Sequence, residues 1–350
     1  MKNRIFLLTA IISISFSSFA HNDNAYYHGT SDLSLNKSWM NNIDNEARVR
    51  NISIPGTHGS GALHGGDIPR NQTLSISQQL NAGIRFLDIR LRHIENDFAI
   101  HHGPFYQKQM FGDVFADVRT FLENNPTEFI FIRVKEEHTA VNNTESFEDT
   151  FNRYVNNNSD IIWVPESKAA NPMIKDVRGK IVFLQNFAPR KYRWFGLDYH
   201  NTFSIQDEYK LSSNLDLYSK WLKVKEHLIQ ANKNQQSHIN FLSGSTGAFP
   251  YFVASGHSSP GTKAPRLLTG LTTPGWKNTY PDFPRVGCFI GICSIAFEGT
   301  NTLTKNYIID NRLKYVGIVV VDFPGSGLIN AIINTNRRNG NFISKDVTDS

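Results

Sequence analysis

Three short polar segments of this sequence place residues suited to proton transfer and anion binding directly after apolar runs. His58 lies in SIPGTHGS (53–60), Arg90 in DIR (88–90) and His102 in HHGP (101–104). A histidine exchanges protons near neutral pH because its unperturbed pKa is about 6.5, and a guanidinium can hold an anion through two parallel hydrogen bonds. The segments therefore indicate general acid–base chemistry, in which one histidine takes a proton, the other gives one and the arginine holds an anion between them.

The chain around these segments reads as strands that alternate with helices. Strand-like apolar runs are expected at 49–54, 84–91, 98–102, 129–134, 180–185, 238–242 and 316–322. Helices are expected at 75–82, 111–124, 146–157, 215–232 and 327–336, with a short helix near 37–43. Strands separated by helices predict a mostly parallel sheet. For this length we expect an α/β fold with a single distorted, incompletely closed TIM-type (β/α) barrel.

Charged residues stand at the ends of several expected strands. His58 follows the first strand, and Asp88 and Arg90 share one face of the second because they are two residues apart. His102 ends the next extended run, and Asp322 closes the last strand. In barrels of this type the chemistry lies at the C-terminal ends of the strands. We therefore expect these five residues to form one site. No Gly-x-Gly-x-x-Gly motif follows a strand, so the sequence does not indicate a dinucleotide site.

Residues 1–20 read as a signal peptide. Lys2 and Arg4 precede a mostly apolar run at 5–16, and Ser18-Phe19-Ala20 fits a small-x-small cleavage site. We expect a secreted protein, extracellular or periplasmic. Residues 21–350 are expected to form a single domain with its core at about 45–340.

Composition and charge limit the range of partners. Hydrophobic residues make up 40% of the chain, which is typical of a globular protein. The formal net charge is +5 and becomes +3 without Lys2 and Arg4, because no acidic residue leaves with them. This mild basicity suits an anionic surface and does not indicate a nucleic-acid partner. No stretch after the first twenty residues approaches 18 apolar residues, so we expect a soluble protein without a transmembrane segment. We also expect a monomer.

The sequence does not decide whether its two cysteines, Cys288 and Cys293, form a disulfide. A secreted protein permits one, but residues five apart on a straight strand point to opposite faces, so a bridge needs a turn between them. No His/Cys cluster that would predict a zinc site stands nearby.

Seven segments in order make the chain resemble the X domain of the bacterial phosphatidylinositol-specific phospholipases C. They span about residues 50 to 323: SIPGTH (53–58), FLDIR (86–90), HHGP (101–104), FLENNPTEFIFIRVKEE (121–137), RGKIVFL (178–184), IQDEYK (205–210) and VGIVVVD (316–322).

The resemblance implies a role for each residue of the expected site. His58 would be the general base that deprotonates the inositol 2-hydroxyl, and His102 the general acid that protonates the departing diacylglycerol. Arg90 would clamp the phosphate, next to Asp88, and Asp322 would hydrogen-bond the base. The products would be diacylglycerol and inositol 1,2-cyclic phosphate. His101, which faces away from its neighbour in an extended run, would be structural.

The resemblance also implies how the substrate is held. Lys135, Asp207, Glu137 and Asn186 would bond the inositol hydroxyls, and Tyr209 would stack under the ring. Because a fixed guanidinium offers positive charge at the phosphate, no metal or other cofactor is expected. The partner would be phosphatidylinositol in membranes. Interfacial contact is expected from one of two segments that mix aromatic with basic or proline residues, 190–195 or 276–283, although both also suit ordinary loop packing.

The chain departs from the family pattern at two places. Gly59 stands where the family usually has an aspartate that supports the arginine and the acid, and Asp67 is the nearest carboxylate that could replace it. Gln185 and Asn186 stand where many members have an arginine. Two alternatives therefore stay open: a glycerophosphodiesterase-type enzyme on the same barrel, and a non-catalytic lipid- or sugar-binding module on a decayed phospholipase scaffold.

Overall fold

The computed structural model describes residues 24–167, 170–188, 191, 194–260 and 265–343. The expected signal peptide at 1–20 lies outside these residues. None of the helices in the described part of the chain combines the length and the apolar character needed to cross a membrane.

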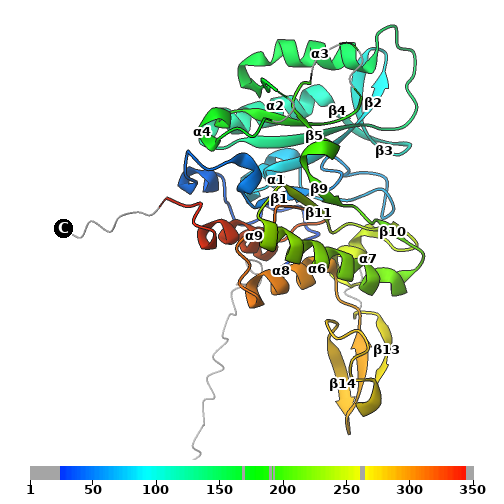
Figure 1. The fold of residues 1–350 in the computed structure, drawn as a ribbon. Coiled ribbons are helices and arrows are strands. Elements are labelled where there is room, and N and C mark those ends of the chain that lie inside the picture. Colours follow the sequence, from blue (N-terminus) through cyan, green and yellow to red (C-terminus); the bar gives the residue numbers. More distant parts are fainter. Residues whose placement is uncertain (1–23, 168–169, 189–190, 192–193, 261–264, 344–350) are drawn as a thin grey trace, which may run out of the picture.

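Eight parallel strands curl into an open half-barrel (Figure 1). Their spatial order is β6 (Ile162–Trp163), β7 (Ile181–Asn186), β5 (Ile130–Glu136), β2 (Phe86–Ile94), β1 (Ile54–Thr57), β16 (Ile318–Val321), β11 (His238–Phe241) and β9 (Ser204–Gln206). Within the described residues β6 and β9 are edges that do not pair with each other, so the barrel is not closed. The expected distorted, incompletely closed barrel is confirmed.

Helices cover the outside of this half-barrel on two sides (Figure 1). They are α1 (Ile76–Ala82), α2 (Phe111–Asn124), α3 (Phe147–Asn157), α4 (Ile174–Val177), α5 (Tyr199–Thr202), α6 (Leu217–Asn234), α7 (Pro250–Ser255), α8 (Thr300–Asp310) and α9 (Ser326–Arg338). Helix α2 shows why the expected helices form where they do. Its buried residues lie three, four, seven, ten and eleven positions after the first, which places them on one face: Phe111, Val114, Phe115, Val118, Phe121 and Leu122. Helices α1, α2, α3, α6 and α9 lie within two residues of the expected bounds.

Strand β1 differs from the expectation, because residues 49–51 form a 3-10 helix and the strand begins only at Ile54. The strand sequence IPGT contains a proline and a glycine, which strand propensity disfavours. Burial decides the conformation here. A Cβ on Gly56 would lie 2.8 Å from the Phe86 side chain, so β1 fits against β2 only with a glycine at this point.

The expected strand at 98–102 forms β3 (Asp97–His102), but it is not one of the parallel strands. It runs antiparallel to β2, with Leu91 opposite Ile100, and continues into β4 (Phe105–Met110). The reversal between β2 and β3 brings His102 back toward Arg90 on β2. The two residues therefore approach each other through a hairpin instead of through neighbouring barrel strands.

A three-stranded antiparallel sheet that the strand pattern did not predict projects from the barrel (Figure 1, yellow to orange). It consists of β13 (Leu268–Thr272), β15 (Ile292–Ala296) and β14 (Arg285–Phe289), in that spatial order. Cys288 on β14 and Cys293 on β15 form a disulfide, with Cα atoms 4.1 Å apart. The turn that such a bridge requires lies between them, at the end of this hairpin.

Candidate active site

A cavity of about 250 Å³ lies at the C-terminal ends of the strands and gathers most of the expected site residues. It is lined by His58, Asn71, Arg90, His102, Arg133, Lys135, Glu137, Asp207, Tyr209, Ser243, Gly244, Ser245 and Pro250. Asp88 and Asp322 do not line it but lie behind it, hydrogen-bonded to residues that do. Asn186 pairs in register with Lys135 between β7 and β5, yet it is not among the lining residues.

The first pair in the site is His58 with Asp322. Thr57 and Val321 are opposite each other on β1 and β16, so the next residue of each strand, His58 and Asp322, leaves the sheet at the same place. The Nδ1 atom of His58 lies 2.8 Å from Oδ1 of Asp322, whose side chain is almost fully buried. A buried carboxylate in this position fixes the ring orientation of the histidine.

Arg90 determines which nitrogen of His58 carries the proton. Nη2 of Arg90 lies 2.7 Å from Nε2 of His58. Because a guanidinium only donates hydrogen bonds, Nε2 must accept, and the proton of the neutral ring stands on Nδ1, where it is donated to Asp322. His58 therefore presents an unprotonated Nε2 to the cavity, which is the form that a general base requires.

Asp88 lies under the cavity and connects three groups of the site. Its carboxylate accepts hydrogen bonds from the Gly59 backbone N–H (3.1 Å), Arg133 Nη1 (3.2 Å) and Arg90 Nε (3.3 Å). Burial acts to raise the pKa of Asp88, but the charges of Arg133 and Arg90 outweigh it and hold the pKa well below its usual range. Asp88 is therefore a permanent anion that holds two guanidinium groups and the turn after His58.

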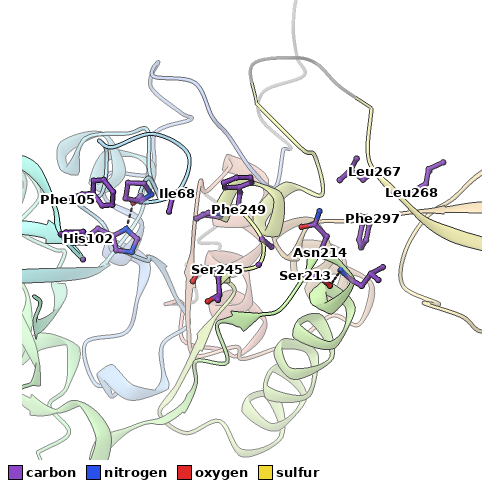
Figure 2. A pocket seen from close by; sticks show the side chains of 18 residues that line it. Ile68, His102, Phe105, Ser213, Asn214, Ser245, Phe249, Leu267, Leu268 and Phe297 are labelled. Atoms are coloured by element: carbon purple, nitrogen blue, oxygen red, sulfur yellow. Dashed lines mark hydrogen bonds between the residues drawn. The ribbon is translucent and has the colours of Figure 1, made fainter.

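His102 faces His58 across the cavity, with ring centroids 6.2 Å apart. Nδ1 of His102 donates to the Pro69 backbone carbonyl at 2.5 Å (Figure 2), which leaves Nε2 as the nitrogen that can exchange a proton with a ligand. Burial lowers the pKa of His102, and the charges of Arg90 and His58 lower it further. His101, by contrast, is buried against the Tyr106 ring outside the cavity.

The position after His58 is filled from elsewhere in the chain. Gly59 has φ +47°, and a Cβ on it would lie 2.7 Å from Oδ1 of Asn71. Asn71 is almost fully buried, lines the cavity, and its Oδ1 has no hydrogen-bond partner among the described residues. Asp67, the carboxylate that could have replaced the family aspartate, is instead exposed and pairs with Arg70 at 3.1 Å. Sequence reasoning missed Asn71, because nothing in its neighbourhood in the chain signals contact with Gly59.

The polar wall of the cavity consists of Lys135, Glu137, Asp207 and Tyr209. Glu137 accepts a hydrogen bond from the Gly103 N–H at 3.0 Å and lies 3.7 Å from Arg90 and 3.5 Å from Lys135. Burial acts to raise the pKa of Glu137, but the Arg90 charge outweighs it and the pKa is lowered. Tyr209 is 45% exposed at this wall, as a ring that stacks on a ligand would be.

Arg133 is a second guanidinium in the cavity; the sequence placed it, with Lys135, among the charged residues at strand ends but gave it no specific role. It is buried, pairs with Asp88, and its guanidinium carbon lies 4.4 Å from the Tyr199 ring centroid. Gln185, at the second departure from the family pattern, is buried and accepts a hydrogen bond from the Phe195 N–H, so its role is structural. Among the described residues, no group of three or more His, Cys, Asp and Glu side chains is placed to hold a metal ion.

Comparison with known proteins gives one family. The family model for "Phosphatidylinositol-specific phospholipase C, X domain" matches residues 68–186. A 1-phosphatidylinositol phosphodiesterase of Listeria monocytogenes is 30% identical over 230 residues, which cover 61% of this chain and 70% of that protein. A protein of the same name from Staphylococcus aureus is 27% identical over 307 residues, covering 77% of this chain and 90% of that one.

Solved structures agree with this assignment at the level of the fold. The phosphatidylinositol-specific phospholipase C from Listeria monocytogenes superposes with a TM-score of 0.63 and 24% identity, over 86% of this chain and 99% of that one. A Staphylococcus aureus enzyme of the same description gives a TM-score of 0.61 at 21% identity, over 86% and 98% of the two chains. The chain therefore belongs to the X-domain family of the phosphatidylinositol-specific phospholipases C.

Proposed function

We propose that this protein is a secreted phospholipase C that cleaves phosphatidylinositol to diacylglycerol and inositol 1,2-cyclic phosphate. The observation that carries the proposal is the arrangement of His58, Arg90 and His102 in one cavity. His58 has its proton on the Asp322 side and its unprotonated Nε2 toward the cavity, Arg90 contacts that atom, and His102 faces both. The curated relatives named 1-phosphatidylinositol phosphodiesterase support the same substrate class.

The reaction is an intramolecular phosphoryl transfer. The inositol 2-hydroxyl oxygen attacks phosphorus while its proton passes to Nε2 of His58. The bond between phosphorus and the glycerol oxygen breaks, and that oxygen takes a proton from Nε2 of His102. The attacking group belongs to the substrate, so no covalent enzyme intermediate forms. Asp322 stabilises the imidazolium of His58 until the proton is released.

Arg90 has to change partners for this reaction to occur. Its Nη2 donates a hydrogen bond to the lone pair of His58 Nε2. A phosphate in the cavity is a stronger acceptor for a guanidinium than a neutral imidazole, because the bond is charge-assisted at both ends. Substrate binding therefore draws Arg90 onto the phosphate and frees the base. Asp88 keeps the guanidinium within reach of both partners.

The polar wall would bind the headgroup. Lys135, Asp207 and Glu137 offer one cation and two carboxylates to the ring hydroxyls, and Tyr209 offers a ring face. Asn186 would act from behind Lys135, because it stands beside Lys135 in the sheet but does not line the cavity. Arg90, together with Arg133 and Lys135, would supply the positive charge at the phosphate, and we propose that no metal is needed.

The product identifies the activity. Protein beginning at residue 21 is incubated with phosphatidylinositol in detergent micelles, and the phosphorus products are followed by ³¹P NMR. We expect inositol 1,2-cyclic phosphate to appear first, and no product from phosphatidylcholine. A linear phosphate as the first product would favour the glycerophosphodiesterase reading. Binding of phosphatidylinositol without any turnover, by protein shown to be folded, would favour the non-catalytic module.

Secretion is part of the proposal and rests on the signal peptide read from residues 1–20. The Cys288–Cys293 disulfide supports it, because such bonds persist in oxidising compartments. Mass spectrometry of protein recovered from outside the cytoplasm should give a chain that begins at residue 21 and is two hydrogens lighter than the reduced form.

A further inference from the structure

The sheet of β13, β14 and β15 exposes an apolar surface that the barrel does not cover. Phe289 and Ile290, at the turn between β14 and β15, are 75% and 82% exposed. Along the sheet the other exposed apolar side chains are Leu268, Leu271, Val286 and Ile292. Single exposed apolar residues are normal on protein surfaces, but several of them gathered on one projecting element point to an interaction site.

The sheet packs against helix α6 at one end and is apolar at the other. Phe283 and Ile295 are buried in the same hydrophobic cluster as Trp221 of α6. Asp282, next to Phe283, accepts hydrogen bonds from Trp221 Nε1 (2.8 Å) and Lys225 Nζ (3.0 Å). Toward the other end, the segments 267–273 and 286–296 contain no charged residue. The sheet is therefore fixed to the barrel at one end and carries an uncharged, exposed end at the other.

The disulfide holds that end in one shape. Cys288 and Cys293 enclose Phe289, Ile290, Gly291 and Ile292 in a closed loop. A loop that is already ordered loses less conformational freedom when it binds than a free loop does. The two most exposed apolar side chains of the sheet are thus presented on a preorganised turn.

A wide apolar groove joins the catalytic cavity to this sheet. Its volume is about 1080 Å³, and the lining residues run from His102, Phe105 and Ile68 at one end to Leu267, Leu268 and Phe297 at the other. Figure 2 shows Phe249 between these two ends. The groove is more than four times the volume of the headgroup cavity, and His102 lines both.

This arrangement matches the two halves of a phospholipid. In the proposed reaction His102 protonates the oxygen of the departing diacylglycerol, so the apolar product leaves from the side of the cavity where the groove begins. The headgroup occupies the polar cavity and the glyceride occupies the groove. The far end of the groove then has to open toward the bilayer, and β13, which supplies Leu268, stands at that end.

We propose that the β13–β15 sheet is a bilayer-docking surface, in which Phe289 and Ile290 enter the outer leaflet and the groove takes the glyceride part of the lipid. The inference rests on the proposed phospholipase activity. Charge supports a lipid surface as the partner. Arg266 pairs with Glu298 at 2.7 Å and Asp282 with Lys225 at 3.0 Å. Among the described residues of 265–296 this leaves Lys277 and Arg285 as cations without an acidic partner within ion-pair distance, and anionic headgroups attract such an excess. Trp276, in the short helix η6 (Pro274–Trp276) after β13, is 66% exposed and suits the interface, whereas Phe283 is core.

The test compares two double variants that remove the same kind of exposed apolar surface. Phe289→Ser/Ile290→Ser removes the end of the sheet, and Leu222→Ser/Ile229→Ser removes two exposed residues of α6. All proteins carry His58→Ala, so binding is read without turnover, and they are sedimented with vesicles of phosphatidylinositol and phosphatidylcholine. We expect the first pair to weaken vesicle binding at least tenfold, because each side chain contributes on that scale when buried, and the second to change it less than twofold.

Two further readouts separate the possible failures. In protein that keeps His58, turnover is measured on vesicles and on a short-chain phosphatidylinositol below its critical micelle concentration. The ratio of the first turnover to the second should fall at least tenfold for Phe289→Ser/Ile290→Ser. Equal vesicle binding by both double variants would overturn the docking surface, whatever the activity. A change from dimer to monomer in sedimentation velocity, without a change in vesicle binding, would also overturn it, because the surface would then join two copies of the chain. If the parent protein turned over neither substrate but still bound vesicles, this would contradict the proposed phospholipase activity and leave the docking surface standing.

Discussion

Nη2 of Arg90 lies 2.7 Å from Nε2 of His58. The residue proposed to hold the phosphate thus rests on the atom proposed to take the proton. In the proposed mechanism the guanidinium leaves this atom for the phosphate, so the contact would couple activation of the base to arrival of the phosphate. Asp88, bonded to Arg90 Nε, would hold the guanidinium within reach of both partners.

His58→Ala and His102→Ala should each lower kcat at least ~100-fold, the usual scale for loss of a general acid or base. His101→Ala is the matched control, because His101 is adjacent in the chain but lies outside the cavity. Steady-state kinetics with circular dichroism melts on the same samples separate catalysis from folding. Near-parental turnover in either of the first two variants would remove that histidine from the mechanism.

Arg90→Lys should lower kcat/KM by at least ~100-fold, as removal of a transition-state donor does. Arg90 contacts Asp88, Glu137 and His58 through three different nitrogens, and an ammonium group cannot reproduce that planar arrangement. Arg92→Lys is the control on the same strand, because Arg92 bonds the Thr139 carbonyl away from the cavity. A variant that keeps a tenth or more of parental kcat/KM would show that point charge alone suffices at residue 90.

Turnover should survive excess EDTA. The reason is the cationic set in the cavity, Arg90, Arg133 and Lys135, which can neutralise the charge that develops on the phosphate. Protein treated with chelator and freed of it by gel filtration is assayed with and without added calcium. Loss of activity that calcium restores would show that a cation takes part.

On the basic side of the pH profile, kcat/KM should begin to fall at a pH below about 6.5, the ordinary pKa of a histidine. The general acid works only when protonated, and burial together with the charges of Arg90 and His58 lowers the pKa of His102. The charge of Glu137 raises that pKa, so Glu137→Gln should move the basic limb to still lower pH. Asp67→Asn, at an exposed carboxylate paired with Arg70, should leave the limb in place. A basic limb that Glu137→Gln leaves in place would contradict the assignment of the acid.

Local pattern accounts for much of the fold and for part of the site. Helix α2 was predictable because its apolar positions recur at helical spacing. His58 and Asp322 were predictable as polar residues after apolar strands, and Arg90 as a charged residue on a strand face. Strand β1 was not, since proline and glycine in IPGT disfavour a strand that only burial against Phe86 enforces. The sheet β13–β15 escaped prediction because its short strands, interrupted by Gly270 and Gly287, lack a sustained alternation.

Two features of the site depend on tertiary contacts that no local pattern encodes. The partner of His102 Nδ1 is a backbone carbonyl, that of Pro69, and a backbone atom leaves no signal in residue type. Asn71 reaches Gly59 across a loop of eleven intervening residues, so its place in the cavity follows from how that loop folds back.

Gly59→Asp tests how the chain manages without a carboxylate after His58. From the sequence, the substitution was expected to raise turnover by supporting Arg90 and His102. The structure changes that expectation, because Gly59 has φ +47° and its Cβ would lie 2.7 Å from Oδ1 of Asn71. The single variant should therefore be destabilised by about 1–2 kcal/mol, the cost of a left-handed non-glycine residue, and should not gain turnover.

Gly59→Asp combined with Asn71→Ala separates the crowding from the chemistry. Removing the amide makes room for the new carboxylate, and a carboxylate near a histidine favours the imidazolium. The double variant should exceed Gly59→Asp in turnover, and its basic pH limb should lie above that of Asn71→Ala alone. Thermal unfolding and pH profiles of the parent, both single variants and the double variant form a complete cycle. If Gly59→Asp alone were as stable as the parent and faster, Asn71 would not be the group that fills this position.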